Sequence, residues 1–300
     1  MEKINHYSVL LSETIKSLNI KADGIYIDMT LGLGGHTKEI AKQLKTGKVI
    51  AIDQDINAIA RAKENLKDYH DKIIFIKSNF RDIDNVLKEL EITKVDGILY
   101  DLGTSYYQLT SKERGFSFKG ETLDMRMDLD ADFDALSLLN NYSESELAKV
   151  FFDYGDVKFA KDLAKEIVLY REEFVFKNAA QFNDIITNFN TYNGKTNFNN
   201  IYQAIRIELN DEIGALEESL EKALGFLKIN GVIAVISFHS FEDKTVKKIF
   251  NKYKNISKET PFEIIRYFRT QKAIYPSSDE LEKNNPSRSA KLRNIIKINE

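Results

Sequence analysis

A chain of 300 residues exceeds one average domain and suits either one large domain with an insertion or two domains. Its hydrophobic share of 43% and charged share of 30% allow a substantial core and exclude wholesale disorder. Cysteine is absent, which excludes disulfides, thiolate zinc sites, iron–sulfur clusters and cysteine nucleophiles. With four histidines in the whole chain, we expect no dedicated metal site.

Charge and hydropathy indicate where the protein works. The amino terminus lacks the apolar run of a signal peptide, and the longest apolar stretch, Val232–Phe238, is too short for a membrane span. We therefore expect a soluble, cytoplasmic protein without a membrane partner. Residues 241–300 hold 14 Lys and Arg against 8 Asp and Glu, although the whole chain has a net charge of −3. This basic region indicates a polyanion partner or, equally well, a solvated basic surface.

The first hundred residues alternate short apolar runs with amphipathic segments. We predict strands at Ile25–Met29, Lys48–Ile52, Ile73–Ile76 and Val95–Tyr100, and helices at Thr37–Leu44, Ile56–Leu66 and Ile83–Leu90. Strands separated by helices of this length indicate βαβ crossovers and a mostly parallel, doubly wound sheet.

Between residues 107 and 207 the strand signals stop. Helical patterns dominate there, at Glu144–Phe152, Phe159–Tyr170 and Ala179–Asn188, and the polar segment Asn190–Asn200 is predicted as a loop. We therefore divide the chain into a first part at 1–106, a helical insertion at 107–207, and a second part at 208–300, and we expect the insertion to be the part that contacts a substrate or partner.

The α/β pattern resumes after the insertion. We predict a long helix at Glu208–Leu227, a buried strand at Gly231–Ser237 and a helix at Glu242–Lys252. Ile264–Phe268 and Leu292–Ile298 are predicted as the last two strands, pairing antiparallel at an edge of the sheet.

A glycine-rich loop follows the first strand, in the stretch from Asp28 to His36 (DMTLGLGGH). Glycines allow a sharp turn and close approach to a ligand, and the next helix presents free N–H groups. The spacing differs from the G-x-G-x-x-G of dinucleotide folds because residue 37 is Thr. Asp28 at the strand end would repel a phosphate, so the loop suits a cationic nucleoside such as S-adenosylmethionine; a purely structural turn is the alternative.

Three further side chains follow the ends of successive predicted strands. Asp53 suits the two hydroxyls of an adenosine ribose, Phe80 suits the adenine ring, and Asp101 ends the fourth strand. Ligands of open α/β sheets bind at the carboxyl ends of the strands, so this set indicates a binding site. Any one of these acids alone is more often a turn residue.

Eight stretches of the chain, in order, resemble one family of proteins. They are residues 28–36 (DMTLGLGGH), 101–105 (DLGTS), 114–118 (RGFSF), 123–128 (LDMRMD), 203–207 (QAIRI), 210–214 (NDEIG), 236–240 (ISFHS) and 288–293 (RSAKLR). Together they resemble the ribosomal RNA small subunit methyltransferase H family, which methylates N4 of a cytosine in bacterial 16S rRNA. The resemblance covers essentially the whole chain.

This resemblance implies a fold, a cofactor and a partner. The fold is α/β: a Rossmann-like S-adenosylmethionine-dependent methyltransferase domain interrupted by a helical insertion. The partner is 16S rRNA of the small ribosomal subunit, in the decoding region. The implied S-adenosylmethionine contacts are Gly34, Gly35, His36, Asp53, Phe80, Asp101 and Gln108. Read on its own, His36 caps the following helix and Gln108 is an ordinary loop residue.

The chain departs from the family pattern at three places. Tyr106-Tyr107 stands where the family usually has Ser-Pro, and Ser8 replaces a usual proline. The stretch 195–201 (KTNFNNI) replaces a segment that contains His-Pro.

The chemistry assigns two further tasks to side chains. The exocyclic amine of cytosine needs a hydrogen-bond acceptor, and Asp101 is the candidate catalytic residue, although a cofactor-holding role is favoured for it. Tyr106 and Tyr107 either stack on the target base or pack the loop.

The remaining candidates concern RNA. His239 either faces the substrate or anchors the loop that contains it. Arg288, Lys291 and Arg293 form the clearest basic cluster and suit rRNA phosphates. Arg114, Arg126 and Arg206 are further candidates, each close in sequence to acids that would pair with it. The rival functions are methylation of another nucleic acid, a protein or a small molecule, and non-catalytic RNA binding.

Overall fold

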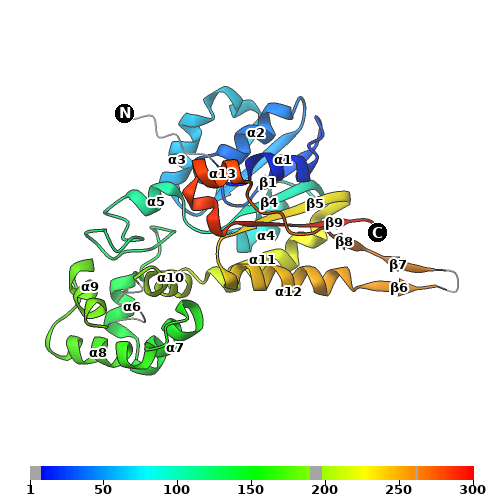
Figure 1. Cartoon of the computed structure of the whole chain (residues 1–300). Coiled ribbons are helices and arrows are strands. Elements are labelled where there is room, and N and C mark those ends of the chain that lie inside the picture. The colour runs from blue at the N-terminus through cyan, green and yellow to red at the C-terminus, as the bar shows by residue number, and fades with distance from the viewer. Residues whose placement is uncertain (1–7, 190–197, 261–262) are drawn as a thin grey trace. The chain divides into compact units, whose positions relative to one another are not determined.

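The computed structural model describes residues 8–189, 198–260 and 263–300 (Figure 1). The chain forms two compact units. The sheet unit comprises Met1–Gly103 and Ile213–Glu300, and the helical unit comprises Thr104–Glu212. The insertion thus begins three residues before the predicted boundary at 107 and ends five residues after the predicted boundary at 207.

The sheet unit contains a seven-stranded sheet in the order β3-β2-β1-β4-β5-β9-β8. The five parallel strands are β1 (Ile25–Asp28), β2 (Lys48–Asp53), β3 (Ile73–Lys77), β4 (Val95–Asp101) and β5 (Leu227–Ser237). The antiparallel strands β9 (Lys291–Lys297) and β8 (Phe268–Thr270) complete one edge. This order confirms the predicted mostly parallel, doubly wound sheet.

Helices cover both faces of this sheet because the parallel strands are apolar on both faces. Alternate residues of each strand point to opposite faces. Ile50 and Ile98 belong to the core beneath α4 (Ile83–Glu89), α11 (Glu212–Phe226) and α12 (Ser240–Lys254). Val49 and Leu99 belong to the core beneath α1 (Leu11–Leu18), α2 (Gly35–Gln43) and α3 (Ile56–Asn65).

Shorter elements connect these layers. They are η1 (Lys67–Lys72), η2 (Phe80–Asp82), α13 (Ser278–Lys283) and η4 (Asn285–Ser289). The chain runs outward from β1 through β2 to β3 on one side, and from β4 to β5 on the other. The direction of winding therefore reverses between β1 and β4, which is where open α/β sheets bind their ligands.

Two sequence predictions for the chain after residue 207 were wrong. The single helix at Glu208–Leu227 is interrupted, because Asp211 adopts the left-handed conformation with φ of 45° between α10 (Phe198–Leu209) and α11. The predicted strand at Ile264–Phe268 is divided. Its first part is β7 (Ile264–Arg266), which pairs with β6 (Ser257–Glu259) in a separate two-stranded ribbon. Antiparallel pairing with β9 begins only at Phe268.

The helical unit contains α5 (Tyr106–Thr110), α6 (Ala135–Asn141), α7 (Glu144–Gly155), α8 (Ala160–Glu173), α9 (Ala179–Asn188) and α10 (Phe198–Leu209). Its own core includes Phe151, Phe182 and Tyr202, all buried. A capping box of Ser143 and Glu146 fixes the start of α7. Thus the unit has an apolar core separate from those of the sheet.

The predicted helices of the insertion correspond to α7, α8 and α9, whereas α5, α6 and α10 were missed. The predicted loop at 190–200 is wrong for residues 198–200, which begin α10, and residues 190–197 lie outside the described residues. Among the described helices, none combines the length and apolar composition that a bilayer span requires.

Candidate active site

Three aspartates end three neighbouring strands of the sheet. Asp28 is the last residue of β1, Asp53 of β2 and Asp101 of β4. The strand β1 lies between the other two, and Asp28 pairs with Ala51 and with Leu99, each two residues before the neighbouring acid. The structure therefore brings the three acids together at the point where the sheet changes its direction of winding.

The glycine-rich loop joins β1 to α2. Gly34 has a φ of 84° and forms the N-cap of α2, a conformation that residues with a Cβ rarely adopt. A Cβ on Gly34 would lie 2.6 Å from Cδ1 of Leu66, and one on Gly35 would lie 1.9 Å from Oγ of Ser8. A side chain at either position would therefore displace its neighbour, and at Gly34 it would also strain the backbone.

Asp28 is buried beneath this loop. Its carboxylate accepts a hydrogen bond from Thr37 Oγ1 at 2.6 Å and one from the Thr30 backbone N–H at 3.2 Å. Burial raises the pKa of Asp28, and these two donors and His36 oppose that rise. Asp28 therefore links the two ends of the glycine-rich loop through Thr30 and Thr37.

Asp53 is held by two backbone N–H groups. Its Oδ2 accepts from Gly32 at 2.8 Å, and its Oδ1 accepts from Asp55 at 2.9 Å. Burial raises the pKa of Asp53 to about 6, although these N–H donors work in the opposite direction. Each carboxylate oxygen has a further lone pair, so Asp53 retains the capacity to accept hydroxyl hydrogen bonds.

Asp101 has two differently placed carboxylate oxygens. Its Oδ2 lies 3.4 Å from Nδ1 of His36, whereas its buried Oδ1 has no hydrogen-bond partner among the described residues. The backbone N–H of Asp101 donates to Thr30 Oγ1 at 2.7 Å, which fixes the end of β4 against the loop. Buried polar atoms are normally paired, so the bare oxygen indicates a position for a ligand.

His36 lies in the first turn of α2 and is almost fully buried. Its Nε2 lies 3.2 Å from the carbonyl oxygen of Val9, and a carbonyl only accepts, so Nε2 must donate. Nδ1 faces Asp101, so a proton there is also matched to an acceptor. Burial disfavours the charged ring, but Asp101, Asp28 and Val9 outweigh that penalty and raise the pKa of His36.

Phe80 follows β3 and begins η2. Its ring packs edge-to-face on Tyr100 at a centroid distance of 5.9 Å, and its carbonyl accepts a hydrogen bond from Ser219 Oγ at 2.8 Å. Tyr100 OH lies 2.7 Å from the same Ser219 hydroxyl. The half-buried ring is therefore fixed in place at the same edge of the sheet.

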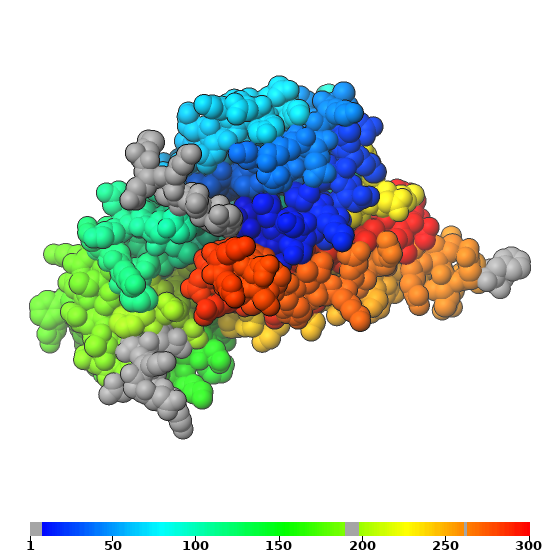
Figure 2. All heavy atoms as spheres, turned by 45° about the horizontal axis from the view of Figure 1, so that its top comes forward, coloured from blue at the N-terminus to red at the C-terminus, as the bar shows by residue number. Residues whose placement is uncertain are grey.

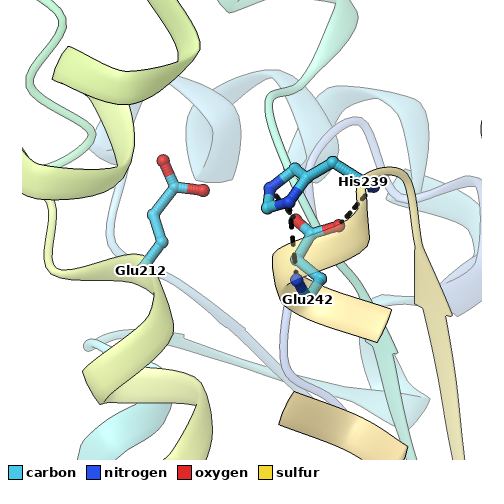
Figure 3. A group of neighbouring side chains, drawn as sticks. All are labelled: Glu212, His239 and Glu242. Carbon is cyan, nitrogen blue, oxygen red and sulfur yellow. Dashed lines mark hydrogen bonds and ion pairs between the residues drawn. The ribbon is translucent and has the colours of Figure 1, made fainter. Parts of the chain in front are cut away.

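His239 occupies the N-cap of α12. Its Nδ1 accepts from the Glu242 N–H at 3.4 Å, and the Glu242 carboxylate accepts from the backbone N–H groups of Phe238 and His239. Figure 3 shows the imidazole beside this carboxylate, with Nε2 3.1 Å from Oε1. These contacts agree with the alternative in which His239 anchors its own loop.

The basic cluster is partly neutralised within the sheet unit. Lys291 Nζ lies 3.1 Å from Asp243 Oδ2, and Arg293 Nε lies 2.6 Å from Asp243 Oδ1. Arg288, the third member, is exposed and forms no ion pair with the described residues. The sequence did not reveal this pairing because about fifty residues separate Asp243 from its partners.

The remaining candidates belong to the helical unit. Gln108 is buried and forms a capping box with Ser105 at the start of α5, so its amide oxygen accepts from the Ser105 N–H at 3.0 Å. Tyr106 and Tyr107 are the first two residues of this helix, and Tyr106 is 37% exposed. Neither tyrosine lies in the buried core of the unit.

The three further arginines are held by local contacts in the helical unit. Arg126 pairs with Asp124, and Arg206 pairs with Glu212. Arg114 is buried and donates to the Arg126 carbonyl at 2.7 Å.

Comparisons with known proteins identify the family. The model of the MraW methylase family matches residues 3–298. Proteins named "Ribosomal RNA small subunit methyltransferase H" from two strains of Clostridium botulinum are each 44% identical over 317 aligned residues, covering 99% of this chain and 100% of theirs. This chain belongs to the MraW methylase family. It is an S-adenosylmethionine-dependent methyltransferase, and the family resemblance deduced from its motifs is confirmed.

Solved structures resembling this methylase share little sequence with it. An rRNA methylase from Streptococcus thermophilus has a TM-score of 0.45 and 12% identity, and the match covers 99% of both chains. A methyltransferase from Streptococcus mutans, solved in complex with SAH, has a TM-score of 0.45 and 14% identity, covering 98% of this chain and 100% of that one.

The residues at the carboxyl edge fit the methyl donor of this family. The carboxylates of Asp28, Asp53 and Asp101 supply negative charge suited to a sulfonium cation. The buried Oδ1 of Asp101 can accept a hydrogen bond from a ligand, because no described residue donates one to it. The glycine turn adds the free N–H groups of the α2 N-terminus.

Several residues that build this site were missed in the sequence. Thr30 and Thr37 flank the glycines and hold Asp101 and Asp28, and the Val9 carbonyl orients His36. The sequence could have indicated the two threonines, because both are hydroxyl residues close to Asp28 and to the glycine turn. Val9 had none, because its contribution is a backbone atom.

We predict that replacing His36 lowers stability in a pH-dependent way. Because the folded-state pKa is raised, the protonated ring contributes stability that is fully present below its unfolded value of about 6.5 and is lost as the pH rises through the folded value. His36→Gln should therefore reduce the free energy of unfolding by about 1.5–3 kcal/mol at pH 6.

Urea unfolding between pH 6 and pH 9 measures this effect. The loss should shrink as the pH rises, and His70→Gln at an exposed site controls for the chemical change itself. A loss that stays constant or grows toward pH 9 would show that His36 is not held as a cation.

Proposed function

We propose that this methylase transfers a methyl group to the exocyclic N4 of a cytosine in 16S rRNA of the small ribosomal subunit. The observation that carries the proposal is the correspondence, over essentially the whole chain, with relatives named for small-subunit rRNA methylation. A cytoplasmic location follows from that substrate.

The chemistry explains why orientation matters here. The lone pair of the cytosine amine is delocalised into the ring, so the amine is a poor nucleophile. S-adenosylmethionine supplies an activated methyl group when it is bound. Holding the amine in line with that group contributes about 7–11 kcal/mol of the barrier reduction in well-oriented reactions.

We assign the cofactor roles to residues of the sheet unit first. Gly34, Gly35 and His36 form the turn that the donor approaches, Asp53 accepts from its ribose hydroxyls, and Phe80 lies against its adenine. Asp101 offers its bare oxygen to the donor. His36 lies against the other oxygen and fixes the orientation of the carboxylate, and we favour the cofactor role of Asp101 over proton removal.

The remaining roles belong to residues of the helical unit. We assign to Gln108 a supporting contact with the methyl donor. We assign to Tyr106 and Tyr107 a stacking contact with the target base, since Tyr106 is partly exposed. The helical unit as a whole then recognises the RNA. His239 acts on the substrate only indirectly, by fixing the loop before α12.

The proposed reaction is tested with labelled methyl donor. We expect the wild-type protein to label 16S rRNA or assembled small subunits that lack the modification, and nucleoside analysis should find the label in N4-methylcytidine. Large-subunit RNA is the control. Label in another nucleoside, or no label in either small-subunit substrate, would contradict the proposal.

A second test concerns Asp53. Its carboxylate must be ionised to accept both ribose hydroxyls, and its pKa is raised to about 6. Affinity for S-adenosylmethionine should therefore be constant above pH 6 and fall toward tenfold per unit below it. Asp53→Asn should weaken binding by about 1–3 kcal/mol at pH 7 and remove this step.

Calorimetric titration of both proteins between pH 5 and pH 7 measures the difference. Other groups that titrate in this range affect wild type and variant alike, so the comparison isolates Asp53. Parallel pH profiles for the two proteins would remove Asp53 from the ribose site.

A further inference from the structure

A two-stranded ribbon extends from the end of α12. The strands β6 and β7 pair antiparallel over three positions, from Ser257 opposite Arg266 to Glu259 opposite Ile264. Figures 1 and 2 show this segment as a projection at one end of the sheet unit. We define the basic arm as the described residues 254–260 and 263–272, which include the ribbon and the edge strand β8.

The root of the arm is firmly attached. The backbone N–H of Ile298 donates to the Tyr267 carbonyl at 2.8 Å, and Asn299 Nδ2 donates to the Arg266 carbonyl at 2.7 Å. Phe268 packs edge-to-face on Tyr253 at a centroid distance of 5.7 Å. The ribbon therefore projects from a fixed base.

Beyond this root the ribbon has little to stabilise it. Isolated two-stranded ribbons are marginal in water, and this one has only three residue pairs. Its described residues are nearly all exposed, including Ile256 at 42% and Ile264 at 57%. An exposed ribbon of this kind is suited to contact with a partner.

The charge of the arm indicates the partner. Five cations stand against the acids Glu259 and Glu263, in a chain whose net charge is negative. The five are Lys254, Lys258, Arg266, Arg269 and Lys272. Within the described residues none of these five side chains forms an ion pair, and all five are exposed.

Other cations of the carboxyl-terminal region are already paired. Lys248 and Lys252 contact Glu217 and Glu221, and Asp243 holds Lys291 and Arg293. Much of the positive charge available to a partner therefore lies on the arm rather than in the cluster predicted from the sequence.

We propose that the basic arm binds the phosphate backbone of the RNA substrate. This inference rests on the proposed function, because it takes the RNA to be the small-subunit rRNA. Exposed cations on a ribbon reach phosphates without reading bases, so the arm adds affinity and orientation rather than sequence specificity.

The test compares two triple variants of the full chain. The arm variant removes three positive charges from the arm through Lys258→Gln, Arg266→Gln and Arg269→Gln. The control variant removes the same charge from exposed sites that precede β2, β3 and β4, through Lys45→Gln, Lys67→Gln and Lys88→Gln. Equal affinity of both variants for S-adenosylmethionine shows that both are folded.

Binding to 16S rRNA and to assembled small subunits is then measured over a range of salt concentrations. The arm variant should bind more weakly, and its salt slope should fall by about two to three units, at about 0.7–0.9 per lost phosphate contact. The control variant should keep the wild-type slope.

Three results would overturn the inference. An unchanged salt slope with aggregation of the arm variant would mean that the cations only protect an exposed sheet edge. Weaker binding to subunits with an unchanged slope would assign the arm to a ribosomal protein. If the wild-type protein methylates rRNA and the arm variant binds rRNA equally well, the inference about the arm is wrong but the proposed function stands. If the wild-type protein neither methylates nor binds rRNA, both the proposed function and the inference about the arm are wrong.

Discussion

The site depends on how the sheet unit accommodates three carboxylates at one edge. Each charge removed from water costs several kcal/mol unless it is paired or hydrogen-bonded. Asp28 is supported by Thr37 and Asp53 by the Gly32 N–H, whereas Asp101 relies on the imidazole of His36. The buried imidazole is in turn held by the Val9 carbonyl. The amino-terminal segment, the glycine loop and the end of β4 are thus linked through one ring.

This arrangement leaves the edge of the sheet short of positive charge. Burial raises the pKa of both Asp28 and Asp53, and the hydrogen bonds that they accept do not offset this rise. A cationic ligand with hydroxyl donors relieves that imbalance, whereas a pyrophosphate would increase it. The acids therefore explain, in physical terms, why this sheet suits the methyl donor of its family rather than a dinucleotide.

The sequence was sufficient for the sheet and for the acids at its strand ends. Short apolar runs followed by Asp28, Asp53 and Asp101 place those acids at one edge in any parallel, doubly wound sheet. Features that depend on a single backbone angle or a distant partner were not predictable. The left-handed Asp211 divides a helix whose pattern is continuous, and Asp243 neutralises Lys291 and Arg293 from fifty residues away.

The central claim is that Asp101, held by His36, contacts the methyl donor rather than taking a proton from cytosine. Calorimetry of S-adenosylmethionine binding to Asp101→Asn, combined with single-turnover methylation at saturating donor, tests it most directly. We predict that binding weakens by about 1.5–3 kcal/mol and that saturating donor restores much of the rate. Unchanged donor affinity with a single-turnover rate reduced about 10²–10⁴-fold would instead make Asp101 the general base and contradict its assignment to the donor site.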